Sequence, residues 1–203
     1  MRDQQLMWNE SSRETLLESP IFSVRSIHRH SSDGREGDFI CLDAPDWVTV
    51  VPLLSGEQRD DHDGDQGPQF IMVEQFRHGS GKVTFEFPAG TIDPGEEPQR
   101  AAERELLEET GYTAGALIPL GNVSPNPAFM NNRVHVFLAN DLVWHKEQEL
   151  DENEQIHTHL EPVDKVRQQM GSGTYDNGVM VIALQFFSRY MEKLGADRIR
   201  TGE

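Results

Sequence analysis

Three glutamates, Glu105, Glu108 and Glu109, lie within five consecutive positions of the sequence. On a helix, residues three or four positions apart share one face, so these carboxylates would gather side by side. Carboxylate oxygens are ligands that suit Mg²⁺, and the ion also accepts phosphate oxygens from a substrate. Such a cluster is also common on a solvated helix face. The glutamates alone therefore leave two interpretations open, a divalent-metal site and a charged surface.

The residues around the glutamates indicate how they would be positioned. Pro98 suits the first turn of a helix and Gly111 its C-terminal exit, and the residues between them are strong helix formers. On that helix, Arg104 can form an ion pair with Glu108 one turn later. Upstream, the Pro-Ala-Gly sequence at 88–90 predicts a turn that can bring a main-chain carbonyl to the same ion.

The composition narrows the classes of partner. The chain has 203 residues and a formal net charge of −17, with no basic stripe, so nucleic-acid binding is not expected. An anionic substrate would need local positive charge from arginines or from metal ions. The apolar runs are too short for a transmembrane helix, and the N-terminus lacks the apolar segment of a signal peptide. We expect a cytoplasmic protein that does not bind membranes.

Other residues with chemical potential favour plainer interpretations. Cys41 is the single cysteine, which excludes an internal disulfide, and its apolar surroundings predict a buried, inert thiol. The acidic loop at 61–65 begins like a calcium loop but lacks the later glycine and glutamate, so we expect a solvated hairpin tip. The Gly-Ser-Gly-Lys at 79–82 lacks the other residues of a phosphate loop. The His-X-His pairs at 28–30 and 157–159 lack further ligands at zinc spacing.

The hydrophobic pattern predicts mostly strands in the first half and helices interspersed later. Strand-like runs occupy parts of 21–44 around a Gly-rich turn, then 47–54 and 70–76 as a hairpin, and later 133–139. A closing helix is predicted over 179–194. By itself, this pattern indicates a mixed α/β protein preceded by a small N-terminal β unit.

One longer pattern includes the glutamates. Gly90, five residues, Glu96, seven residues and then Arg-Glu-Leu-Leu-Glu-Glu-Thr-Gly-Tyr at 104–112 resemble the Nudix box. Every fixed position of that signature matches, while Tyr112 stands where an aliphatic residue is usual. The resemblance implies a Nudix-type α/β/α sandwich with a mixed sheet, and it favours a metal site over a solvated face.

Around the box, residues 45–190 are similar to the ADP-ribose/ADP-sugar pyrophosphatase branch of Nudix hydrolases. The similarity lies in VEQFRHG, EFPAGTIDPGE, RVHVFLA and DENEQI, and in Pro127, sixteen residues after the last glycine of the box. It implies metal-dependent hydrolysis of ADP-ribose or another ADP-sugar to a nucleoside monophosphate and a sugar phosphate. It also implies a homodimer in which residues 1–44 exchange between subunits, beside a hydrolase domain at 45–203.

The resemblance assigns roles to individual residues. The ligands of Mg²⁺, with Mn²⁺ as the alternative ion, would be the Ala89 carbonyl, Glu105, Glu108, Glu109 and Glu154. The catalytic set would be Glu152 as general base, Arg104, which orients the glutamates, and Glu108. Structural roles within the box are expected for Gly90, Glu96 and Gly111. Independently of the resemblance, Arg77 is expected to contact a phosphate because a guanidinium forms paired hydrogen bonds with phosphate oxygens. Phe129 is a further expected substrate contact, and Glu86 is expected to hold either the substrate or the structure around it.

Two alternatives stay open at this point. The loop at 126–132 is rich in asparagine, so a different sugar nucleotide or a dinucleoside substrate is possible. A Nudix-fold module that binds a nucleotide without cleaving it is the second alternative, although such modules typically lack box glutamates. Trp8 and Phe22 could stack a base across a dimer, but aromatic residues in such a unit more often form core or interface.

Overall fold

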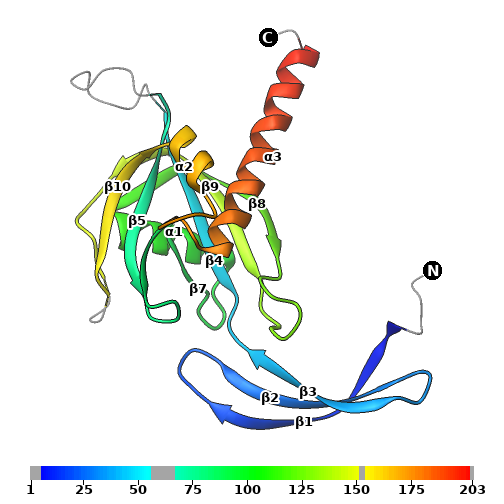
Figure 1. Cartoon of the computed structure of the whole chain (residues 1–203). Coiled ribbons are helices and arrows are strands. Elements are labelled where there is room, and N and C mark those ends of the chain that lie inside the picture. The colour runs from blue at the N-terminus through cyan, green and yellow to red at the C-terminus, as the bar shows by residue number, and fades with distance from the viewer. Residues whose placement is uncertain (1–5, 56–66, 151–153, 202–203) are drawn as a thin grey trace. The chain divides into compact units, whose positions relative to one another are not determined.

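The computed structural model describes residues 6–55, 67–150 and 154–201, with side chains up to residue 195. The chain forms two compact units (Figure 1). The first contains Met1–Asp46 and Ser124–Arg133, and the second contains Trp47–Val123 and Val134–Glu203. The acidic loop at 61–65 and the expected base Glu152 lie outside the described residues.

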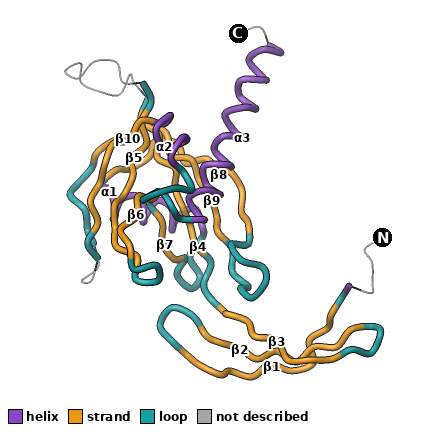
Figure 2. The backbone as a smooth tube through the Cα atoms, in the orientation of Figure 1, coloured by secondary structure: helices purple, strands orange, loops and turns teal. Residues whose placement is uncertain are grey.

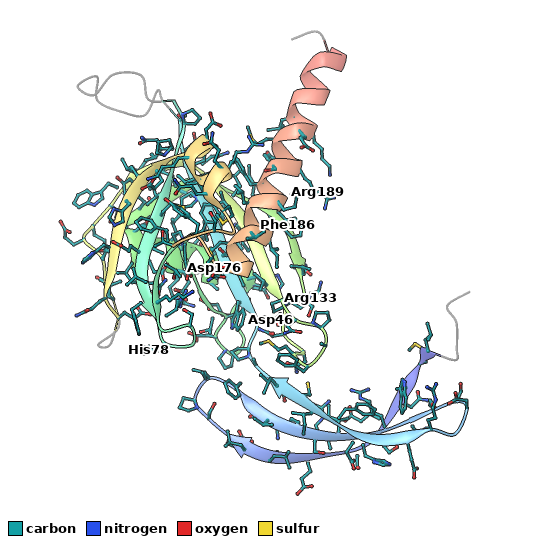
Figure 3. The ribbon with its side chains drawn as sticks, viewed as in Figure 1. Asp46, His78, Arg133, Asp176, Phe186 and Arg189 are labelled. Carbon is teal, nitrogen blue, oxygen red and sulfur yellow. The ribbon has the colours of Figure 1, made fainter. Side chains whose placement is uncertain are left out.

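The first unit is an antiparallel three-stranded sheet in the order β1-β2-β3. Its strands are β1 (Trp8–Glu18), β2 (Ser23–Ser31) and β3 (Glu36–Asp43). The strand pair predicted within 21–44 is confirmed by β2 and β3, whereas β1 was not predicted. The segment 124–133 joins this unit through its backbone, since Leu42 N–H donates to the Phe129 carbonyl at 2.7 Å. Asp46 Oδ1 accepts a hydrogen bond of 2.8 Å from the Arg133 N–H, where the chain leaves this unit (Figure 3).

Cys41 in β3 is half-buried, so the expectation of a buried thiol is wrong in degree. The described strands of this unit form a single sheet layer, in which a strand residue is covered less than in a sandwich. The thiol contacts the Leu42 carbonyl, with Sγ 3.7 Å from the oxygen.

The second unit is built on a seven-stranded sheet in the order β10-β5-β4-β9-β8, with β6 paired to β5 and β7 to β4. The strands are β4 (Trp47–Leu54), β5 (Gln69–Arg77), β6 (Lys82–Glu86), β7 (Ala89–Thr91), β8 (Tyr112–Val123), β9 (Val134–Trp144) and β10 (Ile156–Pro162). Strands β4 and β9 are parallel and the other pairs are antiparallel, so the sheet is mixed as expected. The hairpin predicted from 47–54 and 70–76 is confirmed by the antiparallel pair Leu53 and Phe70.

Helices cover both faces of this sheet, which confirms the sandwich (Figure 2). The helices are α1 (Pro98–Thr110), α2 (Val163–Gln169) and α3 (Gly178–Thr201). Successive strand residues point to opposite faces, so Val50 packs with α1 while Val51 packs with α2 and α3. Because the central strands are covered on both sides, they are almost continuously apolar. In the described residues, no helix combines the length and apolarity needed to cross a membrane.

Candidate functional site

Helix α1 carries the three glutamates and begins and ends as the sequence predicts. Pro98 occupies its first turn, and Gly111 ends it in the left-handed conformation with φ 76°, donating its N–H to the Leu107 carbonyl. The inner face, formed by Ala101, Ala102 and Leu106, is buried against the sheet. Replacing such a buried leucine by alanine typically costs about 2–5 kcal/mol, so this packing fixes the helix firmly.

The glutamates differ in exposure along this helix. Glu109 is 4% exposed, and the side chains of Glu105 and Glu108 are 13% and 37% exposed. The cluster therefore extends from the protein interior to the solvent, rather than forming a fully solvated face. A substrate and water could reach its outer end while the inner carboxylates are held by protein.

Arg104 links the cluster to the loop before the helix. Its Nη1 donates to Glu105 at 2.7 Å and to Glu108 at 3.2 Å, which confirms the expected pair one turn apart. Its Nε and Nη2 donate to both oxygens of Glu96 at 3.0 and 2.9 Å, and Nη2 also reaches the Thr91 carbonyl at 3.0 Å. The planar guanidinium thus fixes three carboxylates at once, which a lysine could not do.

Glu96 fixes the turn between β7 and α1. Its Oε2 accepts a hydrogen bond of 3.1 Å from the Asp93 N–H, in addition to the two from Arg104. The hydrogen bonds from Arg104 lower the pKa of Glu96, with smaller contributions from Asp93 and from the charge of Arg104. Glu96 is therefore ionised at neutral pH and ties the loop to the helix.

Gly90 allows β7 and α1 to approach closely. A Cβ atom at this position would lie 2.1 Å from both the Cδ and the Oε1 of Glu105. The Glu105 carboxylate therefore occupies the space that any other residue type would fill. Glycine is required here because of this close approach, not because of an unusual backbone angle.

The inner carboxylates have raised pKa values. Burial raises the pKa of Glu109 well above its ordinary value, and the charges of Glu105 and Glu154 add to this, against the Ala89 N–H, 3.0 Å from its Oε2, and Arg77. Burial likewise raises the pKa of Glu105, against the opposing effect of Arg104. A nearby cation would favour the ionised form of both groups.

These residues fit a hard divalent cation by donor type. Three carboxylates project from one face of α1, and the Gly90 cradle holds one of them against the strand that carries Ala89. In the described part of the chain, no three acidic, histidine or cysteine side chains already form a coordination sphere. Arg104 donates to the carboxylates of Glu105 and Glu108, and the Ala89 N–H donates to Glu109.

Glu154 is brought within electrostatic reach of this cluster, although 45 positions separate it from Glu109. Its charge raises the pKa of Glu109 and of Glu105, in each case as a smaller effect than burial. Glu154 itself is exposed. The structure therefore places one acidic residue of the loop that follows β9 on the same side of the molecule as the box glutamates.

Arg77 and Glu86 form an ion pair between neighbouring strands, which the sequence did not predict. Arg77 Nη2 lies 2.7 Å from Glu86 Oε2, and the Thr84 hydroxyl donates to Glu86 Oε1 at 2.6 Å. Burial opposes ionisation of Glu86, which is 0% exposed, but the hydrogen bonds and charge of Arg77, aided by Thr84, lower its pKa. The Arg77 side chain is 41% exposed and interacts electrostatically with Glu109 and Glu154.

Phe129, Trp8 and Phe22 all belong to the first unit. Phe129 is half-exposed and lines an apolar groove of about 500 Å³ together with Trp8 and Phe39. The Trp8 and Phe39 rings meet edge to face with centroids 5.2 Å apart. Trp8, Phe39 and Phe129 therefore pack around one groove of the first unit.

The segment after β9 caps the C-terminal end of α1, which sequence reasoning missed. His145 N–H donates to the Gly111 carbonyl at 2.8 Å, and Glu149 N–H donates to the Glu108 carbonyl at 3.0 Å. The Gln148 side-chain amide donates to the Glu109 carbonyl. The start of the acidic loop is thereby joined to the helix that carries the glutamates, and no local sequence signal indicates such a contact.

Known proteins are similar to this chain in sequence and in fold. The model of the NUDIX domain matches residues 48–178. The chain is 47% identical over 147 residues to an ADP-ribose pyrophosphatase of Bacillus subtilis (strain 168), covering 70% of this chain and 74% of that protein. It is 30% identical over 131 residues to the ADP compounds hydrolase NudE of Escherichia coli (strain K12), covering 64% of each. A crystal structure of an ADP compounds hydrolase superposes with a TM-score of 0.79 at 23% identity, covering 95% of this chain and 98% of that one.

Proposed function

Because this chain belongs to the Nudix family, we propose that it is a divalent-metal-dependent pyrophosphohydrolase that cleaves ADP-ribose or another ADP-sugar. The products would be a nucleoside monophosphate and a sugar phosphate. The observation that carries the proposal is the graded carboxylate cluster of α1, with Glu105 in the Gly90 cradle and Glu109 buried behind it. The names of the relatives above support the choice of an ADP-linked substrate.

In this proposal, Glu105, Glu108, Glu109, Glu154 and the Ala89 carbonyl hold Mg²⁺, with Mn²⁺ as the alternative ion. When bound, the ion would act as a Lewis acid, which offsets negative charge on the pyrophosphate oxygens and lowers the pKa of a water molecule. Arg104 keeps the carboxylates of Glu105 and Glu108 in place through its two Nη1 contacts. Orientation of ligands by such outer contacts typically changes activity by about 10–100-fold.

Arg77 is proposed to bind a phosphate of the substrate. Its Nε and Nη2 donate to Glu86, and no described residue accepts a hydrogen bond from Nη1, so Nη1 can donate to a phosphate oxygen. The buried Glu86 thus acts by orienting Arg77. Glu152 is proposed as the general base and Phe129 as a further substrate contact, both on the resemblance to the family.

We further propose that residues 1–44 mediate a homodimer and that 45–203 form the hydrolase domain of a cytoplasmic enzyme. The presence of an N-terminal antiparallel sheet supports the first part of this proposal. Measurement of the molar mass in solution, with and without residues 1–44, tests it. A monomer for the full chain would refute it.

The function is tested by separating the products by chromatography after incubation with Mg²⁺. The substrate panel contains ADP-ribose, other sugar nucleotides, NADH and dinucleoside polyphosphates. The wild type is compared with Glu109→Gln and with the matched control Glu103→Gln, which removes the same charge from the exposed side of α1, where Glu103 pairs with Arg100.

We expect AMP release from ADP-ribose by the wild type and by Glu103→Gln, loss of release in Glu109→Gln, and loss on addition of a chelator. Faster cleavage of another member of the panel would keep the pyrophosphohydrolase and replace its substrate. Binding of a nucleotide without cleavage of any panel member would refute hydrolysis and favour a binding module.

A further inference from the structure

The chain changes partner strand at Phe87 and Pro88, immediately before the turn that carries Ala89. Up to Glu86 the backbone pairs with β5, where Glu86 lies opposite Val73. From Ala89 onward it pairs with β4, where Ala89 lies opposite Thr49. A backbone that leaves one ladder and joins another needs other partners for its buried polar groups in between.

Those partners come from the other strands and from α3. The Pro88 carbonyl accepts hydrogen bonds from the Val50 N–H at 2.9 Å and from the Thr49 hydroxyl at 3.4 Å. Pro88 has no N–H. The N–H of Phe87 donates to the sulfur of Met180, at a distance of 2.9 Å from nitrogen to Sδ. The Pro88 carbonyl and the Phe87 N–H of the crossing therefore both have partners.

Met180 lies in the first turn of α3 and is 1% exposed. It is a member of the core cluster that includes Phe87, Met72 and Phe187, where leucine would serve equally well for packing. A thioether sulfur, however, is a weak hydrogen-bond acceptor, which leucine is not. The Thr49 hydroxyl also lies 4.0 Å from the same sulfur.

We infer that Met180 is a positioning residue for the metal-binding turn, because its sulfur fixes the Phe87 peptide two residues before Ala89. Ala89 donates its N–H to Glu109 at 3.0 Å, and its carbonyl is the main-chain ligand of the proposed metal site. This inference rests on the proposed function, since it assigns Met180 to the metal site of that reaction. It connects α3, on one face of the sheet, to the glutamates of α1 on the other.

The inference is tested by Met180→Leu, with Met72→Leu as the matched control. Met72 is fully buried in the same cluster, and no hydrogen bond to its sulfur occurs among the described residues. Both substitutions preserve side-chain volume, so their effects on packing are comparable. The measurement is the Kd for Mn²⁺ in the absence of substrate, by electron paramagnetic resonance, together with thermal stability.

We expect Met180→Leu to weaken Mn²⁺ binding by up to about tenfold, the lower end of the loss for a direct partner of a metal ligand, because Met180 acts through the Phe87 peptide two residues before Ala89. Met72→Leu should leave Mn²⁺ binding unchanged. Unchanged Mn²⁺ binding in Met180→Leu, or equal weakening in both variants, would overturn the inference even if stability falls. Failure of the wild type to bind Mn²⁺ would instead refute the proposed metal site, and the inference with it.

Hydrogen exchange of the wild-type protein gives a second test that needs no variant. The Phe87 amide should exchange as slowly as the paired amides of β5. Exchange as fast as that of an exposed turn would show that the sulfur does not hold this N–H, and would overturn the inference.

Discussion

Substitution of Gly90 by alanine should lower the catalytic activity while leaving the thermal stability of the protein almost unchanged. The new Cβ would lie 2.1 Å from Cδ and Oε1 of Glu105 and 2.4 Å from its Oε2. Carbon atoms in comfortable contact are about 3.5–4.0 Å apart, so the carboxyl group must retreat by about 1.5 Å. That movement breaks the 2.7 Å hydrogen bond from Arg104 to Glu105.

The expected loss of activity follows from this displacement. Misplacement of a reacting group by about 1 Å can cost about 100-fold in rate, which corresponds to about 3 kcal/mol in the activation free energy. The displaced atoms are the end of a flexible side chain, and Gly90 does not have a positive φ. Loss of conformational freedom in the unfolded chain even favours alanine by about 0.4–1 kcal/mol. We therefore expect Tm to change by no more than about 3 °C.

The assay is kcat/KM for ADP-ribose with the Kd for Mn²⁺, set beside Tm from differential scanning calorimetry. Gly79→Ala is the control, because a Cβ at Gly79 would meet nothing within 4 Å. Near-normal activity and Mn²⁺ binding in Gly90→Ala would refute the assigned place of Glu105. A large drop in Tm would show that the strand backbone moves rather than the side chain.

Three further predictions concern the second unit, which also contains Gly90. Gly111→Ala should lower the free energy of unfolding by about 2 kcal/mol or more. The reason is that φ is 76° at this position and the new Cβ would lie 2.1 Å from the Lys146 carbonyl oxygen. An unchanged denaturant midpoint would contradict this prediction. Because the pKa of Glu86 is lowered, its ion pair with Arg77 stabilises the protein above the unfolded pKa of about 4.3, and this contribution is lost as pH falls through the lower folded pKa. Urea unfolding should therefore show a stability difference between wild type and Glu86→Gln that is constant from about pH 8 to 5 and shrinks below about pH 4; a constant difference down to pH 3 would count against it. Arg104→Lys should reduce kcat/KM by about 10–100-fold, because one ammonium group cannot replace the contacts to three carboxylates, and wild-type kinetics would disprove that role.

Elements with local signals could be predicted from the sequence. Pro98 and Gly111 marked both ends of α1, and the apolar run at 179–194 identified most of α3, which extends to Thr201. Strand β1 carries no such signal because nearly all of its residues are exposed, so its side chains do not alternate in polarity. Strand β8 was missed because Gly115, Pro119 and Gly121 disfavour a strand, and the pairing is irregular between the last two.

The functional site also contains features that local sequence predicts and long-range contacts that it does not. Three glutamates on one helix face follow from helical spacing alone, and so does the pair of Arg104 with Glu108. The contact of Met180 with Phe87 joins residues 93 positions apart, and that of Gln148 with Glu109 joins residues 39 apart. Such contacts depend on which elements pack together, and no periodicity within either segment specifies them.

The last turn of α1 contains Glu108 and Glu109 and no basic residue, and its first turn contains no acidic residue. This is the opposite of what the helix macrodipole favours, because the C-terminal end of a helix is negative. The arrangement weakens the free helix and makes its C-terminal end more attractive to a cation. By thermodynamic linkage, an ion that binds only the folded chain stabilises it by about 2.7 kcal/mol at a hundredfold excess over Kd. The unfavourable placement of negative charge at the C-terminal end of α1 therefore couples the stability of the protein to the concentration of its ion.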